Sequence, residues 1–489
     1  MSHWIIAPVL IPALVAALMV LALRGRLVAQ RVMAGASTLA QLALAIGLMV
    51  AAADGPHAYF LGDWPAPFGI VLVLDRLSAL MLLVTAALAV IVLLFVVVTA
   101  WDAKGRHFHA LFQFQLMGLN GAFLTGDAFN LFVFFEVLLI ASYGLMIHGG
   151  GAERLRAGVQ YIAFNLVAST LFLFALALTY AVTGTLNMGD LGVKVAALPA
   201  GDSALIRVAA VLMVLVFAIK GALVPLQFWL PGTYALAPAP VAALFAVMTK
   251  VGAYAVIRTM SVVFPGEAPA IGTMLADMLM PAALMTLAVG AVGVMGARTV
   301  GRQAAFAAIA SMGTVFIAVA LDSAEGTAAA LYYMVHSTLV GAALFLIADR
   351  VGAQGLWGKR APLPGALAAL FMGVAVASAG LPPLSGFVGK LLVLDAARGQ
   401  MAVVWTVILV SSLVMVMGFA RAGSALFWKP GGEVAAAPRT PLMPVVLLVV
   451  ALAALTVLAG PAMRFMKATA ADLHEPAAYV AAVLVRAGE

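Results

Sequence analysis

The chain has 489 residues, of which 65% are hydrophobic and 9% are charged, and its formal net charge is +7. Soluble domains contain about 25% charged residues, so this composition excludes a water-soluble globular protein and indicates a chain embedded in lipid. The basic residues are scattered singly, which excludes a nucleic-acid-binding face, and the absence of cysteine excludes iron–sulfur clusters and thiolate metal sites, so no cofactor or metal is expected.

Apolar runs long enough to cross a bilayer recur along the whole chain. A crossing needs about 20 apolar residues, and about fourteen runs meet this requirement, which predicts an all-α polytopic membrane protein. The runs cover residues 4–23, 27–52, 71–100, 108–125, 127–148, 159–184, 205–229, 238–263, 274–297, 303–321, 327–349, 363–397, 401–428 and 441–463. The first run lacks a basic flank and a cleavage site, so we expect a retained helix and not a signal peptide. The tail from Arg464 to Glu489 is expected to hold a short interfacial helix.

The connections between the runs alternate in charge. The basic ones fall on one side and hold Arg24, Arg26, Arg31, Lys104, Arg106, Arg154, Arg156, Arg298, Arg302, Arg350, Lys359, Arg360, Lys429 and Arg439. The acidic ones fall on the other side and hold Asp54, Asp63, Asp127, Asp190, Asp202, Glu267, Asp277, Asp322 and Glu325. Basic connections face the cytoplasm. The pattern therefore predicts a multi-pass protein of a bacterial inner (plasma) membrane with both termini on the periplasmic side.

Two of the runs are interrupted by proline. The seventh carries Pro225 and Pro231 beside Lys220, and the twelfth carries Pro382 and Pro383. Proline removes a backbone donor and clashes with the preceding turn, so helices 7 and 12 are both expected to break. Two broken spans five helices apart indicate an inverted repeat with a transport site near the midplane. The expected division is 1–107 for helices 1–3, 108–263 for a first repeat of helices 4–8, 274–428 for a second repeat of helices 9–13, and 441–489 for helix 14 and the tail.

Five ionisable residues lie near the middle of these runs, namely Glu136, Lys220, Lys250, His336 and Lys390. Burying a charge at mid-membrane depth costs about 2.5–3.5 kcal/mol on insertion scales, so a residue kept there is expected to have a function. They come from helices 5, 7, 8, 11 and 12, which suggests a row along the membrane plane.

The chemistry expected of such a row is proton transfer. A medium of low dielectric constant favours the neutral form of a lysine, whereas a nearby carboxylate favours its charged form. A contact between Glu136 and Lys220 that forms and breaks would therefore switch the proton affinity of the lysine. Histidine titrates near neutral pH and can pass a proton onward, with water linking the groups.

Structural explanations remain open beside this functional one. A buried Glu–Lys pair can be purely structural, and a histidine can simply bridge helices. Asp75 and Arg76 lie near the outer start of helix 3. Charged residues near helix ends usually extend to the interface, which is expected of Arg207, Arg258, Asp349, Arg350 and Asp395. Hydrogen bonding between helices is the expected role of Gln113, Gln115, Asn120, Asn165 and Ser169.

Three segments carry a family resemblance: KGALVPLQFWLPGTYALAPAPVAALFAVMTKVGAYAVIR (220–258), HSTLVGAALFLIADRV (336–351) and GLPPLSGFVGKLLVL (380–394). They resemble the antiporter-like subunits shared by respiratory complex I and the Mrp cation/proton antiporters, and the chain is most similar to the D subunit of the Mrp (Pha) type. The resemblance implies a proton path through Glu136 and Lys220, with Lys250 as the bridging lysine, His336 as the helix-11 group and Lys390 as the terminal lysine. Complex I relatives often have a further lysine after the helix-11 histidine, where this chain has Val340 and Gly341.

The function expected from the sequence is that of a proton-translocating subunit of a multisubunit Na⁺(K⁺)/H⁺ antiporter, and not an enzyme. Expected partners are the other Mrp antiporter subunits, of the A, B, C, E, F and G types, together with protons, monovalent cations and the lipid bilayer, and no nucleic acid. One alternative is a proton-pumping membrane subunit of complex I (NADH:quinone oxidoreductase) or of a membrane-bound hydrogenase. Another is a non-conducting scaffold subunit that retains buried ion pairs.

Overall fold

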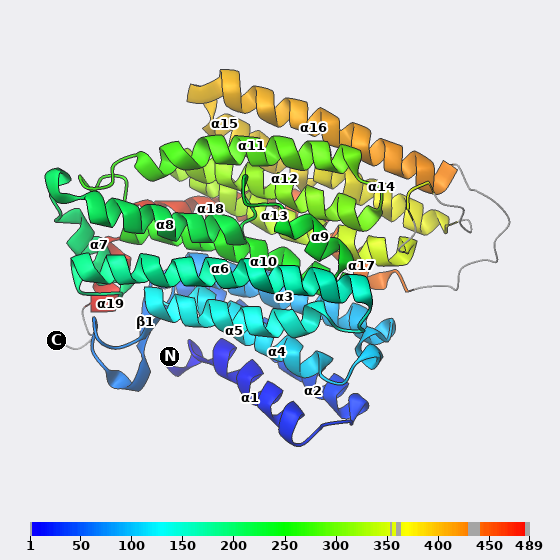
Figure 1. The fold of residues 1–489 in the computed structure, drawn as a ribbon, viewed down its shortest axis with the longest axis horizontal. Coiled ribbons are helices and arrows are strands. Elements are labelled where there is room, and N and C mark those ends of the chain that lie inside the picture. Colours follow the sequence, from blue (N-terminus) through cyan, green and yellow to red (C-terminus); the bar gives the residue numbers. More distant parts are fainter. Residues whose placement is uncertain (1, 353–354, 358–362, 429–440, 485–489) are drawn as a thin grey trace.

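Long helices that run roughly alongside one another make up nearly all of the protein (Figure 1). The computed structural model describes residues 2–352, 355–357, 363–428 and 441–484. Its first ten α-helices are α1 (Ala7–Leu21), α2 (Leu27–Ala51), α3 (Arg76–Val98), α4 (Phe108–Leu124), α5 (Ala128–Met146), α6 (Ala152–Thr183), α7 (Met188–Ala196), α8 (Ala204–Lys220), α9 (Trp229–Leu236) and α10 (Ala239–Arg258). The others are α11 (Met274–Gly296), α12 (Val300–Ala320), α13 (Ala324–Val351), α14 (Gly365–Ala379), α15 (Ser385–Ala396), α16 (Met401–Gly423), α17 (Met443–Val457), α18 (Ala459–His474) and α19 (Ala477–Leu484).

Each of the fourteen predicted spans contains an α-helix or a broken pair of helices. Among the described residues, nine helices are long and apolar enough to cross a membrane, or ten if the bent pair α17 and α18 is one span. The remaining spans are represented by α1, α4, α8, α14 and α17, which have only 15 to 17 residues each. Two of these five are short because they end at a break. The expected all-helical polytopic fold is confirmed.

Several boundaries differ from the sequence-based expectation. Residues 71–74, expected to begin helix 3, form a strand β2 (Val71–Leu74) that pairs antiparallel with β1 (His57–Phe60). A short apolar run such as VLVL has no periodicity that separates a buried strand from a helix. Helix α6 starts seven residues before the expected 159, and α7 lies in the connection between the sixth and seventh predicted spans. The expected helix in the tail is α19, but α18 precedes it and is bent by 76° from α17.

The breaks expected in helices 7 and 12 are confirmed. Helix α8 ends at Lys220 and α9 begins at Trp229, while α14 ends at Ala379 and α15 begins at Ser385. At the first break, the indole Nε1 of Trp229 donates to the carbonyl oxygen of Ile219 at 3.1 Å. A backbone carbonyl left free by the break is thus hydrogen-bonded within the protein, as is required where lipid excludes water.

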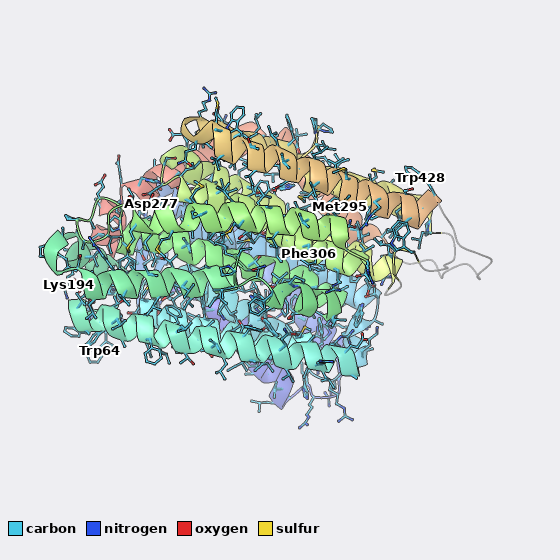
Figure 2. The ribbon with its side chains drawn as sticks, turned by 45° about the horizontal axis from the view of Figure 1, so that its top comes forward. Trp64, Lys194, Asp277, Met295, Phe306 and Trp428 are labelled. Carbon is cyan, nitrogen blue, oxygen red and sulfur yellow. The ribbon has the colours of Figure 1, made fainter. Side chains whose placement is uncertain are left out.

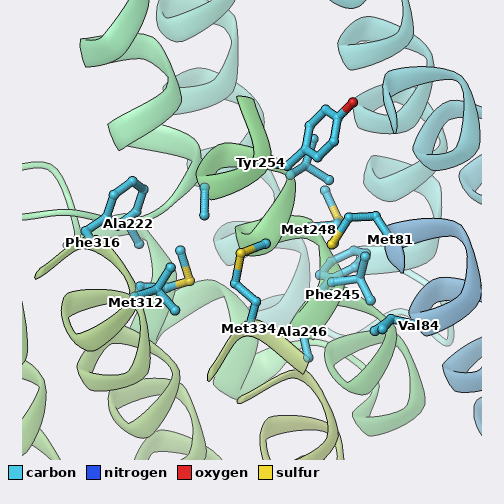
Figure 3. Close-up of a cluster of buried hydrophobic side chains, with 14 of the residues drawn as sticks. Met81, Val84, Ala222, Phe245, Ala246, Met248, Tyr254, Met312, Phe316 and Met334 are labelled. Carbon is cyan, nitrogen blue, oxygen red and sulfur yellow. The ribbon is translucent and has the colours of Figure 1, made fainter. Parts of the chain in front are cut away.

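The centre of the molecule is formed by α10, α12 and α13. The apolar stretch long enough to cross a membrane is 100% buried in α10 and 94% buried in α12 and in α13, whereas in α2 and α16 it is 33% buried. Methionine and aromatic side chains fill much of the space around the central helices; Figure 3 shows Met312 and Phe316 on the side of Ala222, and Phe245 and Met248 on the side of Met81. The central helices are therefore shielded from lipid, which is where ionisable groups are tolerated.

The connections between the helices lie at the two ends of the bundle. Lys194 and Asp277 lie at one end together with Trp64, and Trp428 lies at the opposite end (Figure 2). A basic and an acidic residue thus share one end, and the sidedness expected from the charges stays a prediction. The start of α1 lies at the same end as α19 (Figure 1), which agrees with an even number of crossings. The predicted basic residues Lys359, Arg360, Lys429 and Arg439 lie outside the described residues.

Charged residues near helix ends form two buried ion pairs, although such side chains were expected to extend to the membrane interface. Arg258 donates to both carboxylate oxygens of Asp75, at 2.6 and 2.8 Å, and its side chain is only 3% exposed. Asp349 and Arg350 pair with each other, and their side chains are also largely buried. These residues were expected at the interface because their positions near helix ends are visible in the sequence, whereas their partners are not.

Candidate functional site

Helix α6 connects the two residues that the sequence suggested as a pair. Lys220 donates from Nζ to Oδ1 of Asn165 at 2.7 Å. Glu136, which is half-buried, accepts a hydrogen bond from the hydroxyl of Ser169. Asn165 and Ser169 lie four residues apart on α6, so they share one face of the helix. In the described part of the chain Glu136 forms no direct ion pair with Lys220, and the expected contact is instead bridged by α6.

Lys220 lies beside a small internal cavity. It is the last residue of α8, it is 9% exposed, and its ammonium group lies 5.9 Å from the centre of the Phe135 ring. The cavity has a volume of about 20 Å³, and Asn165 and Tyr161 also line it. A water molecule needs about 10–15 Å³, so this space fits one water against the lysine.

Lys250 lies in the middle of α10 and is 1% exposed. Its one hydrogen bond within the described residues is a long one, 3.5 Å, from Nζ to Oγ1 of the adjacent Thr249. Two residues further along, Gly252 packs directly against the backbone of α8 at its break, beside Phe217 and Lys220. Helix α10, which carries Lys250, thus approaches the end of α8 through Gly252.

His336 is fully buried in α13. Its Nδ1 lies 2.9 Å from Oγ of Ser385, and its Nε2 has no hydrogen-bond partner among the described residues. Lys250 and Lys390 both lie within electrostatic range of the ring. A buried ring nitrogen without a protein partner is a place where water or a transferred proton binds.

Lys390 lies in α15 just after the second break and is 4% exposed. Its Nζ donates to the carbonyl oxygen of Ala379, the last residue of α14, and to Oγ of Ser412, both at 2.8 Å. The absence of a side chain at Gly380 leaves room for this lysine, because a Cβ there would lie 2.5 Å from its Cδ. The break in the helix therefore provides both an acceptor and the space that Lys390 occupies.

The five predicted residues thus fall into two groups within the described structure. His336 lies within electrostatic range of Lys250 and Lys390, whereas Glu136 and Lys220 are linked through α6. Among the described residues no three histidine, aspartate or glutamate side chains gather as metal ligands. The arrangement offers neutral and charged proton acceptors, hydroxyl groups and room for water, which is the chemistry of proton transfer.

Sequence reasoning missed the polar residues that hold the ionisable ones. Asn165, Ser169, Ser385 and Ser412 each bind one of them, but the first two were expected only to join helices. The spacing of Asn165 and Ser169 by one helical turn was a usable signal, since two polar residues on one face of a membrane helix predict a shared polar neighbour.

Comparison with known proteins agrees with this geometry. A family model described as "NADH:quinone oxidoreductase/Mrp antiporter, TM" matches residues 125–418. The chain is 40% identical to the D subunit of a probable K(+)/H(+) antiporter of Rhizobium meliloti (strain 1021), over 99% of this chain and 98% of that protein. It is 36% identical to the D subunit of a Na(+)/H(+) antiporter of Bacillus subtilis (strain 168), over 88% and 87% of the two chains.

A solved structure shows the same fold. A chain in the structure of the Mrp complex from Dietzia sp. DQ12-45-1b superposes with a TM-score of 0.90 at 30% identity, over 99% of this chain and 100% of that chain. The resemblance carried by the three sequence segments is therefore confirmed. The chain belongs to the NADH:quinone oxidoreductase/Mrp antiporter family.

Proposed function

We propose that the chain is the D-type subunit of a multisubunit monovalent cation/proton antiporter and that it moves protons. The observation that carries the proposal is the set of five buried or half-buried ionisable residues in membrane helices, each held by polar side chains or by a broken helix. Such residues are costly in a membrane and typically mark ion or proton pathways. The relatives, which are named as D subunits of K(+)/H(+) and Na(+)/H(+) antiporters, agree with this role.

In the proposed path Lys220 exchanges a proton with the cavity beside it, and Glu136 controls its charge through Asn165 and Ser169. Lys250 and His336 then pass the proton along the central helices to Lys390. Water completes the gaps, as the unpaired Nε2 of His336 suggests. The path requires no redox group within this chain, so the chain acts as a transporter subunit and not as an enzyme.

The proposal extends to partners, division and location. The partners are the other subunits of the antiporter, and the chain divides into helices 1–3, two inverted repeats at 108–263 and 274–428, and a final helix with its tail. We place it in the bacterial plasma membrane with the basic connections in the cytoplasm and both termini outside.

The rival functions make different predictions. A proton-pumping subunit of complex I or a hydrogenase would be encoded beside redox subunits with cysteine clusters, whereas an antiporter subunit would be encoded beside small membrane subunits. A scaffold subunit would lose assembly when its buried residues are changed but keep normal turnover in the complexes that form.

The test uses the complete complex in inverted membrane vesicles with a pH-sensitive dye. Addition of Na⁺, K⁺ or Li⁺ without a respiratory substrate should produce a pH response. Glu136→Gln and Lys220→Ala should abolish that response in fully assembled complexes. The matched controls are Glu153→Gln and Lys194→Ala, because Glu153 is exposed and Lys194 pairs with Asp190 at one end of the bundle. Unchanged antiport by both site variants would refute the proposed path.

A further inference from the structure

Two cavities lie on either side of one tyrosine ring. A cleft of about 1000 Å³ opens near the basic connections, where Arg154, Arg156 and Arg302 line it. The much smaller cavity of about 20 Å³ lies against Lys220. Tyr234 in α9 is the residue, among those described, that lines both. It is 1% exposed, so its ring fills the space between the cleft and the cavity.

Other aromatic rings hold Tyr234 in this position. Its ring centre lies 5.8 Å from that of Trp229, 5.5 Å from Phe245 and 6.0 Å from Phe345. Trp229 lines the small cavity and Phe345 lines the cleft, so the cluster spans the whole distance between them. A continuous layer of aromatic side chains excludes water and interrupts any chain of water molecules that could carry a proton.

The hydroxyl group of Tyr234 is held only weakly. It donates to the carbonyl oxygen of Phe245 at 3.3 Å, longer than the usual 2.7–2.8 Å of an O–H···O bond. A buried tyrosine usually secures its hydroxyl with a good partner. Movement of the ring therefore breaks only a weak hydrogen bond in addition to its aromatic contacts, and helix α9 is itself a short segment between the first break and α10.

We propose that the ring of Tyr234 is a gate that controls the access of water from the cleft to Lys220. With the ring in place, Lys220 exchanges a proton only with the single water of its cavity. When the ring turns toward the cleft, the two cavities join and Lys220 is connected to the aqueous phase on that side. The biological meaning of the gate rests on the proposed function, in which Lys220 carries a proton.

The test measures access to the small cavity and needs no transport activity. The chain contains no cysteine, so a single introduced thiol is the one reactive group in it. Val251→Cys places the thiol in the wall of the small cavity, and it is a mild change because cysteine behaves as a small hydrophobic residue. Gln160→Cys provides a matched control, because Gln160 is exposed in the cleft. Both are treated with a water-soluble methanethiosulfonate reagent in the purified complex, where both membrane faces contact water.

The expected rates distinguish the gate from a passive packing role. In the background of Tyr234→Ala the thiol at position 251 should react at least about tenfold faster than with Tyr234 present, because the two cavities merge. Tyr234→Phe keeps the ring and should change the rate by less than about twofold. Phe345→Ala, which frees space on the cleft side of the ring, should also raise the rate. The thiol at position 160 should react equally fast in all these backgrounds.

Two results would overturn the inference. One is a thiol at position 251 that reacts as fast beside Tyr234 as in the Tyr234→Ala background. The other is a thiol that stays unreactive in both the Tyr234→Ala and Phe345→Ala backgrounds while position 160 remains reactive and the complex assembled. Either result would leave the antiport test of Glu136 and Lys220 unaffected, so the two ideas can fail separately.

Discussion

Gly252 is the position at which a single methyl group should disturb the proposed proton path. A Cβ there would lie 2.6 Å from the carbonyl oxygen of Phe217 and 2.7 Å from the amide nitrogen of Gly221. The first distance is about 0.8 Å short of an ordinary contact of 3.4 Å, and the opposing atoms are backbone atoms that cannot rotate away. Gly252→Ala must therefore push α10 and the end of α8 apart.

The expected size of the effect follows from this displacement. Overpacking of a well-packed core costs about 1–3 kcal/mol, and a gain of up to about 1 kcal/mol in helix propensity offsets part of it. The melting temperature of the purified complex should fall. Because α10 carries Lys250 and α8 ends at Lys220, a shift of nearly 1 Å between them should lower antiport turnover by about ten- to a hundredfold.

Turnover per assembled complex, measured in vesicles, and the melting temperature of the purified complex test this prediction together. Gly373→Ala is the matched control, because Gly373 lies within α14 and no heavy atom lies within 4 Å of the position that a Cβ would take there. If Gly252→Ala behaved like Gly373→Ala in both measurements, the close approach of α10 to the break would have no role in stability or transport.

Three further changes test other contacts. Asn165→Leu removes the acceptor of Lys220 and should lower antiport turnover about tenfold in assembled complexes, because a buried donor is left unpaired; turnover equal to the parent would contradict this. Arg258→Met leaves the carboxylate of Asp75 buried without its cationic partner and should lower the free energy of unfolding by about 3–5 kcal/mol, whereas adding Asp75→Leu should recover part of the lost melting temperature. The carboxylate of Asp102 is hydrogen-bonded to Arg31 and His109. Burial would raise the pKa of Asp102, but the interactions with these two partners outweigh burial and lower the pKa. The stability that this carboxylate contributes is fully present above the ordinary carboxyl pKa of about 3.9, and it is lost as the pH falls through the lower pKa of the folded state. Asp102→Asn should therefore reduce the melting temperature at pH 7, and progressively less below about pH 4.

The parts of the fold that could be predicted from the sequence are those fixed by local chemistry. Proline within an apolar run predicts a break wherever the helix lies, which is why the interruptions after Lys220 and Ala379 were expected. The bend between α17 and α18 was missed, although Gly460 and Pro461 stand just after it, and glycine followed by proline is typical of a helix end.

The contacts of the site were harder to predict because they depend on how the helices are rotated about their axes. Glu136 and Lys220 were expected to meet, yet each binds a different residue of α6. Arg258 near the end of α10 was expected at the membrane surface, yet its partner Asp75 lies 183 positions away in the chain and keeps it buried. No local pattern contains information on such partners.

The two lysines at the broken helices differ in the kind of negative charge that faces them. The C-terminal end of a helix carries about half of a negative elementary charge, and Lys390 contacts that end of α14 through the carbonyl oxygen of Ala379. This counter-charge belongs to the backbone and cannot be neutralised by a proton. Lys220 is instead coupled, through α6, to the carboxylate of Glu136, and a proton can neutralise that carboxylate. In the proposed path, the partner of Lys390 thus has a fixed charge whereas the carboxylate coupled to Lys220 can be switched by a proton, so the proton affinity is open to control at the Lys220 end.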